Sequence, residues 1–223
     1  MGLFDFRRRS IHREQDQVWL TDAAREAGLL LAARSATTGT VVLFHFPSSL
    51  RRFRERLDAE QIAHRVLPEP LRPSQLATTA PPPLRVGVFD SYSPSAPDVW
   101  TGSPPPAAIL NVVVAEHHLV PEPDDAILSF LAALPFPSTV GFHASLEDPG
   151  IAMFAGQLGP VLRRLGVENQ TTAVHSSLLS KSIRRAQHSI RLTARSDVRA
   201  DSAAEWLRLN CPEANTQGVD RNR

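Results

Sequence analysis

The sequence predicts an α/β protein, in which a single parallel sheet is covered by helices and followed by a helical extension at the C-terminal end. Short runs of apolar, β-branched residues alternate with segments of helical periodicity between about residues 20 and 146. Beyond residue 146 the helical pattern continues alone. Hydrophobic residues make up 42% of the 223-residue chain, enough for the core of one such domain. Strands that alternate with helices are typical of parallel sheets with helices on both faces.

The first predicted elements are a helix and a buried strand. Residues 21–35 place alanines and leucines at helical spacing, and Thr21 or Asp22 can cap the first turn. Residues 41–46 form a continuous apolar run, which is typical of a strand buried on both faces. His45 lies inside this run, so we expect it to be a core histidine.

The same alternation predicts the rest of the sheet domain. A proline opens the next helix, where its fixed φ angle and missing N–H are tolerated. The remaining elements expected in this domain are a helix from Pro47, strands over residues 62–67, 84–89, 109–115 and 140–146, and a helix over residues 123–134.

The C-terminal part of the chain is expected to be helical. Asp148 is predicted to cap a segment that ends near residue 166. Residues 174–195 predict a long helix with one partly apolar face and one basic face. A last short helix would begin after Asp201 or Ser202, either of which can cap it.

Prolines punctuate the chain and suggest its organisation. The sequence contains 19 prolines, and two clusters of them, rich also in Ser, Thr and Ala, are interpreted as linkers or surface loops outside the core. The expected organisation is a mobile basic segment at residues 1–16, a sheet domain at 17–148 with proline-rich loops at 68–83 and 94–106, a helical extension at 149–210, and a disordered tail at 211–223.

Composition narrows the classes of function. The net charge of +1 does not demand a nucleic acid or an acidic surface as partner. The single cysteine, Cys211, cannot form an internal disulfide or frame a zinc site, so we expect a reducing compartment. The sequence contains no run of about 18 apolar residues, the length needed to span a membrane. Its N-terminus is not typical of a signal peptide. We therefore expect a soluble, cytoplasmic protein.

The clearest cluster of reactive side chains follows the strongest predicted strand. Glu116, His117 and His118 fit either a metal or catalytic cluster, or a strand-end turn whose polar groups are satisfied. The turn is favoured because no further ligand spacing supports a metal. Asp124 and Asp125 are interpreted as charges favoured at a helix N-terminus rather than as an acid pair. No catalytic, cofactor-binding or metal-binding residue is therefore predicted.

Two helix faces carry clustered basic side chains. A solvated face is the first interpretation, and the alternatives are docking to an acidic protein surface, to anionic lipid or to RNA. RNA comes last because aromatic residues for base stacking are missing between the basic ones. The candidate interaction residues are Arg51, Arg52, Arg54, Lys181, Arg184, Arg185 and Arg191.

Several segments, in order and with matching spacing, resemble the SecA protein-translocation ATPases. Residues 145–148 read Ser-Leu-Glu-Asp, as in that family. Residues 112–118 resemble a family strand that ends in Thr-Glu-Arg-His. Residues 153–156 resemble the family's Arg-Ile-Phe-Gly, and residues 164–168 resemble its Arg-Leu-Gly-Met-Glu. Residues 174–176 and 179–187 resemble the first helix of the family's helical scaffold.

The resemblance implies a RecA-like lobe of the kind found at the C-terminal side of P-loop helicases, here the second motor lobe of SecA and the start of its scaffold. It covers roughly residues 17–210 and is weakest over residues 68–108. It also implies which motifs to look for, because the second lobe supplies arginines to a nucleotide held by the first.

The residues that would handle ATP are replaced. Counted back from Ser145, the three arginine positions hold Leu128, Phe130 and Ala133. Apolar side chains cannot hydrogen-bond phosphate or stabilise the charge on a transferred phosphoryl group. The family's Ala-Gly-Arg-Gly-Thr-Asp-Ile type of loop is also lost, at residues 89–94, and no Gly-x-x-x-x-Gly-Lys-Ser/Thr phosphate loop occurs.

The resemblance and its departures together predict a non-catalytic, SecA-like interaction protein that binds no cofactor. A translocase ATPase, the translocation channel or a precursor protein is the implied partner, with contact to an anionic membrane surface as a second option and nucleic acid not expected. Two alternatives stay open: one lobe of a split ATPase completed by another chain, and an RNA-binding protein derived from a helicase lobe.

Overall fold

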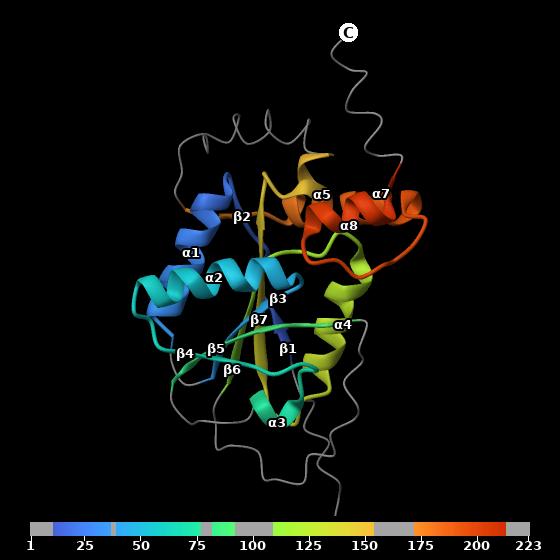
Figure 1. The fold of residues 1–223 in the computed structure, drawn as a ribbon. Coiled ribbons are helices and arrows are strands. Elements are labelled where there is room, and N and C mark those ends of the chain that lie inside the picture. Colours follow the sequence, from blue (N-terminus) through green and yellow to red (C-terminus); the bar gives the residue numbers. More distant parts are fainter. Residues whose placement is uncertain (1–10, 37–38, 77–81, 92–108, 154–171, 213–223) are drawn as a thin grey trace, which may run out of the picture.

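The computed structural model describes residues 11–36, 39–76, 82–91, 109–153 and 172–212. Among these residues, eight strands form one sheet between helices on both faces, and further helices gather at one end (Figure 1). The predicted α/β fold class with a C-terminal helical extension is therefore confirmed. None of the helices in the described ranges is both long enough and apolar enough to cross a membrane.

The sheet is parallel except at one edge, where β2 and β8 run antiparallel. Two of its central strands, at residues 40–44 and 84–88, are buried along their whole length, as their continuous apolar runs predict. Across the sheet the strands are β4 (His64–Val66), β5 (Leu84–Val88), β3 (Thr40–Phe44), β6 (Leu110–Val114), β7 (Ser138–Ser145), β2 (Gln17–Trp19) and β8 (Val174–His175), with β1 (Ile11–Arg13) also beside β7.

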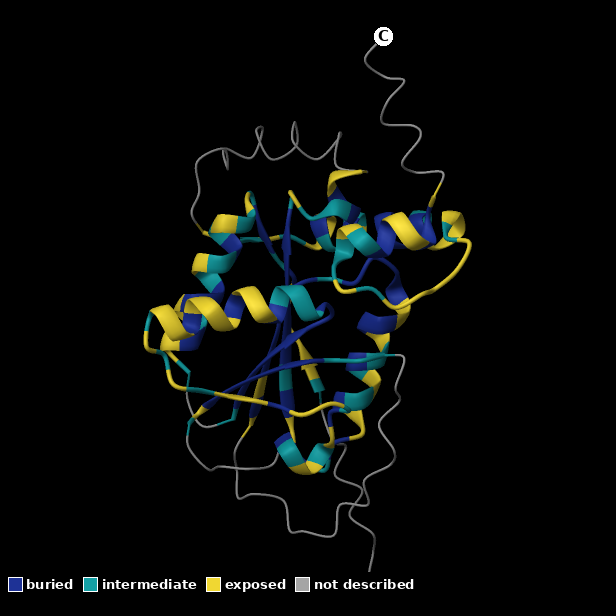
Figure 2. Cartoon of the chain, in the orientation of Figure 1, coloured by how far each residue is buried: buried dark blue, intermediate teal, exposed yellow. Residues whose placement is uncertain are grey.

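Helices cover both faces of the sheet and one of its ends (Figures 1 and 2). α1 (Asp22–Arg34) and α2 (Pro47–Ala59) bury their apolar sides against one face. α3 (Pro73–Leu76) and α4 (Pro121–Ala132) pack on the other. The helices at the carboxyl ends of the strands are α5 (Pro149–Ala152), α7 (Ser177–Thr193) and α8 (Ala203–Asn210).

Local sequence explains where the main helices begin. Thr21, not Asp22, caps α1, because its hydroxyl accepts a hydrogen bond from the backbone N–H of Ala24. Ser202 caps α8 in the same way. Pro47 occupies the first position of α2, as its fixed φ angle favours.

The N-terminal segment differs from the expectation. Residues 11–16 were expected to belong to a mobile basic segment. Instead, β1 and then β2 pair with successive parts of β7, so that Ile11 lies opposite Ser138 and Trp19 lies opposite Ser145. The free side of β7 supplies these backbone hydrogen bonds, so the strands need little apolar sequence of their own. β8 likewise forms where residues 174–175 were expected to start a helix.

The first proline-rich loop is also more than a surface linker. Leu71 and Leu76 are buried in the core beside α4, and residues 73–76 form α3. The buried guanidinium of Arg85 donates to the carbonyl oxygens of Gln75 and Leu76, at 3.1 and 2.8 Å. The segment therefore closes one face of the sheet. The second proline-rich loop, residues 94–106, lies outside the described residues, as does the expected helix end near residue 166.

A close contact between α1 and Trp19 makes a glycine necessary. A methyl group added at Gly28 would lie 2.2 Å from the Trp19 ring, and the indole N–H donates to Nδ1 of His143 at 3.2 Å, which holds the ring in place. We expect Gly28→Ala to lower the free energy of unfolding by about 1–3 kcal/mol, even though alanine favours a helix by about 1 kcal/mol. Urea unfolding measures this change. A more stable variant would show that the ring moves aside at little cost.

Candidate functional site

The most promising place for a site is the carboxyl end of the sheet between β3 and β6. The chain leaves β3 toward α2 on one face and leaves β6 toward α4 on the other, although the two strands are neighbours. In open α/β sheets, ligands bind where adjacent strands diverge in this way. The turns after β3 and β6 place His45, Glu116, His117 and His118 at this point. Three of these residues are buried, and His117 is half-buried with a side chain that is 6% exposed.

Asp124, in the first part of α4, is the centre of a buried polar cluster. One carboxylate oxygen lies 2.6 Å from Nδ1 of His117, and the other lies 2.8 Å from Nε2 of His45, an ion-pair distance without good hydrogen-bond alignment. The backbone N–H of His118 and the side-chain amide of Gln187 also donate to this carboxylate, at 3.0 and 2.7 Å. These contacts hold the pKa of Asp124 far below its usual range, although burial alone would raise it.

The pKa values of the two neighbouring histidines are shifted in opposite directions. Burial disfavours the charged form of His117, but the charge and hydrogen bond of Asp124 outweigh this and raise the pKa of His117. Asp16 adds a second carboxylate 3.7 Å from Nε2 of His117. Burial, followed by the charge of His45, lowers the pKa of His118 to about 3, so this ring is neutral. Its Nδ1 accepts a hydrogen bond from the N–H of Val120.

Glu116 serves the start of α2. Its carboxylate accepts hydrogen bonds from the backbone N–H groups of His45 and Phe46 and from the hydroxyl of Ser49, at 3.2, 3.1 and 2.7 Å. It therefore satisfies donors at the N-terminus of a helix. Burial raises the pKa of Glu116, opposed by the charge of Arg25 and the hydrogen bond from Ser49.

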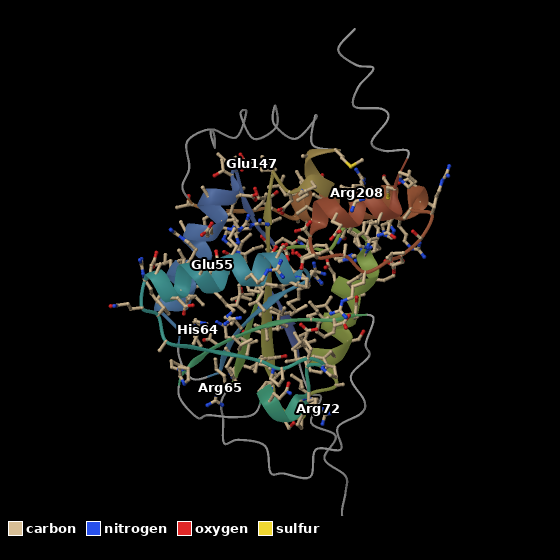
Figure 3. All side chains as sticks on the ribbon, viewed as in Figure 1. Glu55, His64, Arg65, Arg72, Glu147 and Arg208 are labelled. Carbon is tan, nitrogen blue, oxygen red and sulfur yellow. The ribbon has the colours of Figure 1, made fainter. Side chains whose placement is uncertain are left out.

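The Ser-Leu-Glu-Asp segment forms the turn after β7. Glu147 accepts the backbone N–H of Asp22 at the start of α1, near the top of the molecule in Figure 3. Asp148 pairs with the buried guanidinium of Arg25 at 2.6 Å and accepts the N–H of Ser145 at 2.7 Å. Asp148 precedes α5 but makes no side-chain cap to it, in contrast to the expectation. The Ser-Leu-Glu-Asp turn therefore joins β7 to α1.

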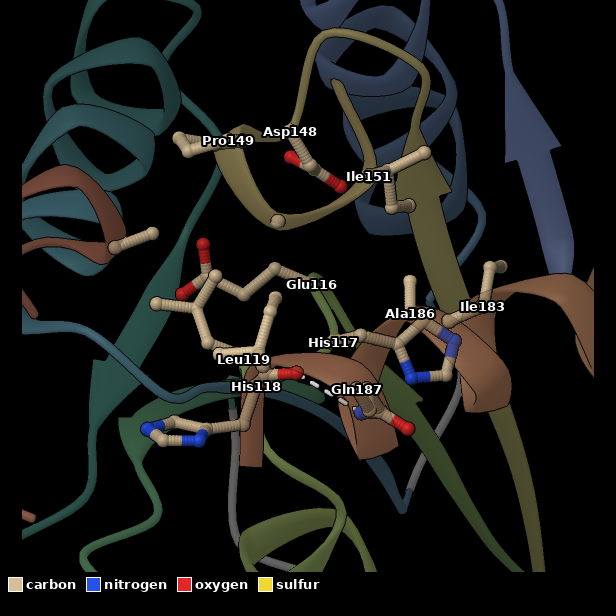
Figure 4. A pocket seen from close by; sticks show the side chains of 13 residues that line it. Glu116, His117, His118, Leu119, Asp148, Pro149, Ile151, Ile183, Ala186 and Gln187 are labelled. Carbon is tan, nitrogen blue, oxygen red and sulfur yellow. Dashed lines mark hydrogen bonds between the residues drawn. The ribbon is translucent and has the colours of Figure 1, made fainter. Parts of the chain in front are cut away.

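The C-terminal helices cover the site. In Figure 4, Gln187 of α7 reaches the main chain of His118, to whose carbonyl oxygen it donates at 2.8 Å. Trp206 of α8 packs edge-on against His118 at 5.4 Å between ring centres. The space left beside Glu116 and Asp148 is about 30 Å³, room for one or two water molecules. Pockets that hold small organic ligands are about 300–1,000 Å³.

A strand-end turn is present at residues 116–118, as expected, but its polar groups are not all satisfied, because the buried Nε2 of His117 has no hydrogen-bond partner among the described residues. Asp124 lies in the first turn of α4, as expected, but it is also the buried partner of two histidines, which the interpretation as a helix N-terminal charge did not include. Asp125 does lie at the surface, where it pairs with Arg184. In the described ranges, no group of three or more His, Cys, Asp or Glu side chains could hold a metal ion.

Sequence reasoning missed the partners that come from distant segments. Asp16, Arg25 and Gln187 were not singled out. Gln187 carried a signal, because it is a polar residue on the apolar side of a predicted helix, between Ile183 and Ile190. A buried amide in such a position requires hydrogen-bond partners.

The positions expected for arginines lie in or just after α4 and away from the cluster. Leu128 and Phe130 are half-buried against the core, and Phe130 contacts the ring of Phe89 at 5.7 Å between centres. Ala133 is exposed immediately after the helix. These side chains complete an apolar surface and offer no hydrogen-bond donor.

The candidate basic residues are divided between internal ion pairs and solvent. Arg184 and Arg191 of α7 pair with Asp125 and Glu122 of α4, and Arg51 pairs with Asp201 before α8. These three pairs fasten the helical extension to the sheet domain. The other four, for which no ion pair occurs among the described residues, are exposed: Arg52, Arg54, Lys181 and Arg185.

Comparison with known proteins adds little to this geometry. No protein-family model and no curated protein matches the chain. Among solved structures, the crystal structure of the C-terminal part of the Fun30 ATPase domain is similar, with a TM-score of 0.38 and 8% identity, over 74% of this chain and 54% of that one. The chain thus spans about half of that structure, and a similarity at this level says nothing about function.

Proposed function

We propose that this chain is a non-catalytic interaction module with a motor-lobe fold, acting as an accessory to the machinery of protein translocation. The observation that carries the non-catalytic part is the filled carboxyl end of the sheet. Gln187 and Trp206, from the C-terminal helices, occupy the place above β3 and β6 where a ligand of this fold class would bind.

The chemistry at this end of the sheet also argues against a bound phosphate. The nearest ionisable groups include the carboxyl groups of Glu116, Asp124 and Asp148, of which Glu116 and Asp124 are buried and Asp124 has a pKa far below its usual range. Ionised carboxylates repel phosphate. The guanidinium of Arg25, which could attract an anion, is already paired with Asp148 and Asp22. An active site of the split-ATPase kind would further need donors where Leu128 and Phe130 stand.

The proposal that the module acts in protein translocation rests on the sequence. The Ser-Leu-Glu-Asp turn and the scaffold-like helix at residues 179–187 are the segments that resemble the translocation ATPases. In this chain both serve packing: the turn binds α1, and the helix covers the sheet. A lobe that keeps its packing residues and lacks its phosphate ligands fits a role in binding another protein.

Two measurements test the proposal. A fluorescent ATP analogue with Mg²⁺ should show no saturable binding to the purified chain up to about 1 mM, the weak end of specific binding. The tagged chain, recovered from its native cells, should bring down components of the translocation machinery. Saturable nucleotide binding would contradict the non-catalytic role. Recovery of ribosomal or RNA-associated proteins without export components would contradict the process.

A further inference from the structure

α7 presents three distinct sides to its surroundings. Its inner side is buried against the sheet domain and the other C-terminal helices, and a second side is tied to α4 by the ion pairs of Arg184 and Arg191. The third side faces away from these contacts. We call it the outer face of α7, and it consists of Leu178, Lys181, Arg185, His188 and Leu192.

The outer face ends in leucines that are unusually exposed. Leu178 is 67% exposed and Leu192 is 88% exposed. The helix rise of about 1.5 Å per residue puts them about 21 Å apart on the same side. The five residues follow each other at alternating intervals of three and four, the spacing at which one helix packs along another. The pattern therefore suits a partner that is itself helical.

The middle of the outer face carries positive charge that nothing in the described chain neutralises. Lys181 and Arg185 are exposed, and neither forms an ion pair with a described residue. On the adjacent side of the same helix, Arg184 and Arg191 are matched by carboxylates of α4. The unpaired cations thus coincide with the exposed leucines, so one partner could cover both.

We propose that the outer face of α7 binds an acidic helix of a protein partner, with Asp or Glu opposite Lys181 and Arg185 and apolar residues opposite Leu178 and Leu192. Charge complementarity selects an acidic partner over a basic or neutral one. A protein fits better than a membrane, because a helix that lies in a bilayer surface needs a continuous apolar stripe, whereas here charged and polar residues separate the two leucines. This inference rests on the proposed role as an interaction module and names its surface.

A site-specific cross-link tests the proposal in the full chain. A photo-reactive amino acid replaces Leu178 in the native cells, and the peptide attached to it after illumination is sequenced. We expect a segment with helical periodicity, acidic in its middle. Arg185→Glu should reduce the cross-link about tenfold or more, since reversal of a charge opposes the partner's carboxylates. Arg72→Glu is the matched control, because Arg72 is also exposed and lies at the opposite end of the molecule (Figure 3). It should leave the yield unchanged.

Other outcomes would overturn the surface assignment. These are an absent cross-link, an attached segment without acidic residues, or a yield that Arg185→Glu does not change. Flotation with vesicles of phosphatidylcholine and phosphatidylglycerol covers the membrane alternative: binding that Arg185→Glu abolishes would assign the face to lipid instead. The sequence of the attached peptide tests the surface, while the identity of its parent protein tests the proposed function, so the two can fail separately.

Discussion

Asp124→Ala is expected to lower the free energy of unfolding by about 3–5 kcal/mol, the range found when one partner of a buried ion pair is removed. The substitution removes the carboxylate whose charge and hydrogen bond raise the pKa of His117. It also removes the acceptor for the backbone N–H of His118 and for the side-chain amide of Gln187. Because Gln187 belongs to α7, the loss should loosen the helical extension as well.

The neighbouring residue provides the control for this prediction. Asp125→Ala removes a carboxylate from the next position of α4, but its pair with Arg184 is solvent-exposed. Such surface pairs contribute about 0–1 kcal/mol. Urea unfolding of both variants at neutral pH measures the difference. Equal effects at the two positions would mean that the buried cluster is not a centre of stability.

The second large effect is a loss of folding stability at acidic pH, caused by His143. Burial, followed by the charges of Arg25, His117 and His175, lowers the pKa of His143 to about 3, and its Nδ1 accepts the N–H of Trp19 in the neutral form. In the unfolded chain a histidine titrates near its ordinary pKa of about 6.5. Below that pH the unfolded chain binds a proton that the folded chain does not, so His143 destabilises the fold progressively as pH falls.

His143→Gln should remove this liability while it keeps an oxygen that can accept from Trp19. Relative to the natural chain, the free energy of unfolding of the variant should rise by about 1.4 kcal/mol for each unit that the pH falls between about pH 6 and pH 4. Urea unfolding at a series of pH values measures the difference between the two proteins. Above about pH 7 that difference should be constant, which serves as the control. A difference independent of pH throughout would refute the assignment of a neutral His143.

The sequence allowed the central sheet to be predicted because its strands carry their own signal. Strong strand signals lie in the apolar runs at residues 41–46 and 109–115. Such runs favour burial on both faces of a sheet, whichever strands they pair with. β1, β2 and β8 could not be predicted, since each has two or three residues of mixed polarity. Their strand conformation comes from the open side of β7 and of β2, which is tertiary information.

The candidate site was predicted only in part for a related reason. Glu116, His117 and His118 were singled out correctly because they follow a strong strand. Asp124 was interpreted as a charge at a helix start, and it does lie in the first turn of α4, but it is also the buried partner of His45 and His117. His45 and His117 come from the turns after β3 and β6, so this pairing is tertiary information that the local sequence of α4 does not contain. The roles expected for Arg52, Arg54, Lys181 and Arg185 stay predictions.

The attachment of β1 and β2 to β7 has a consequence for the order in which the chain folds. β2 lies between β7 and β8, so its partners are made long after it. During synthesis, β1 and β2 leave the ribosome before residues 138–145, which form the strand they both pair with. The ion pair between Arg25 of α1 and Asp148 likewise cannot form until Asp148 has been synthesised. Pairings between distant segments slow folding, because a long loop must close first. The N-terminal strands should therefore dock late, before β8 alone among the described strands, and a nascent chain stopped before β7 would hold them exposed.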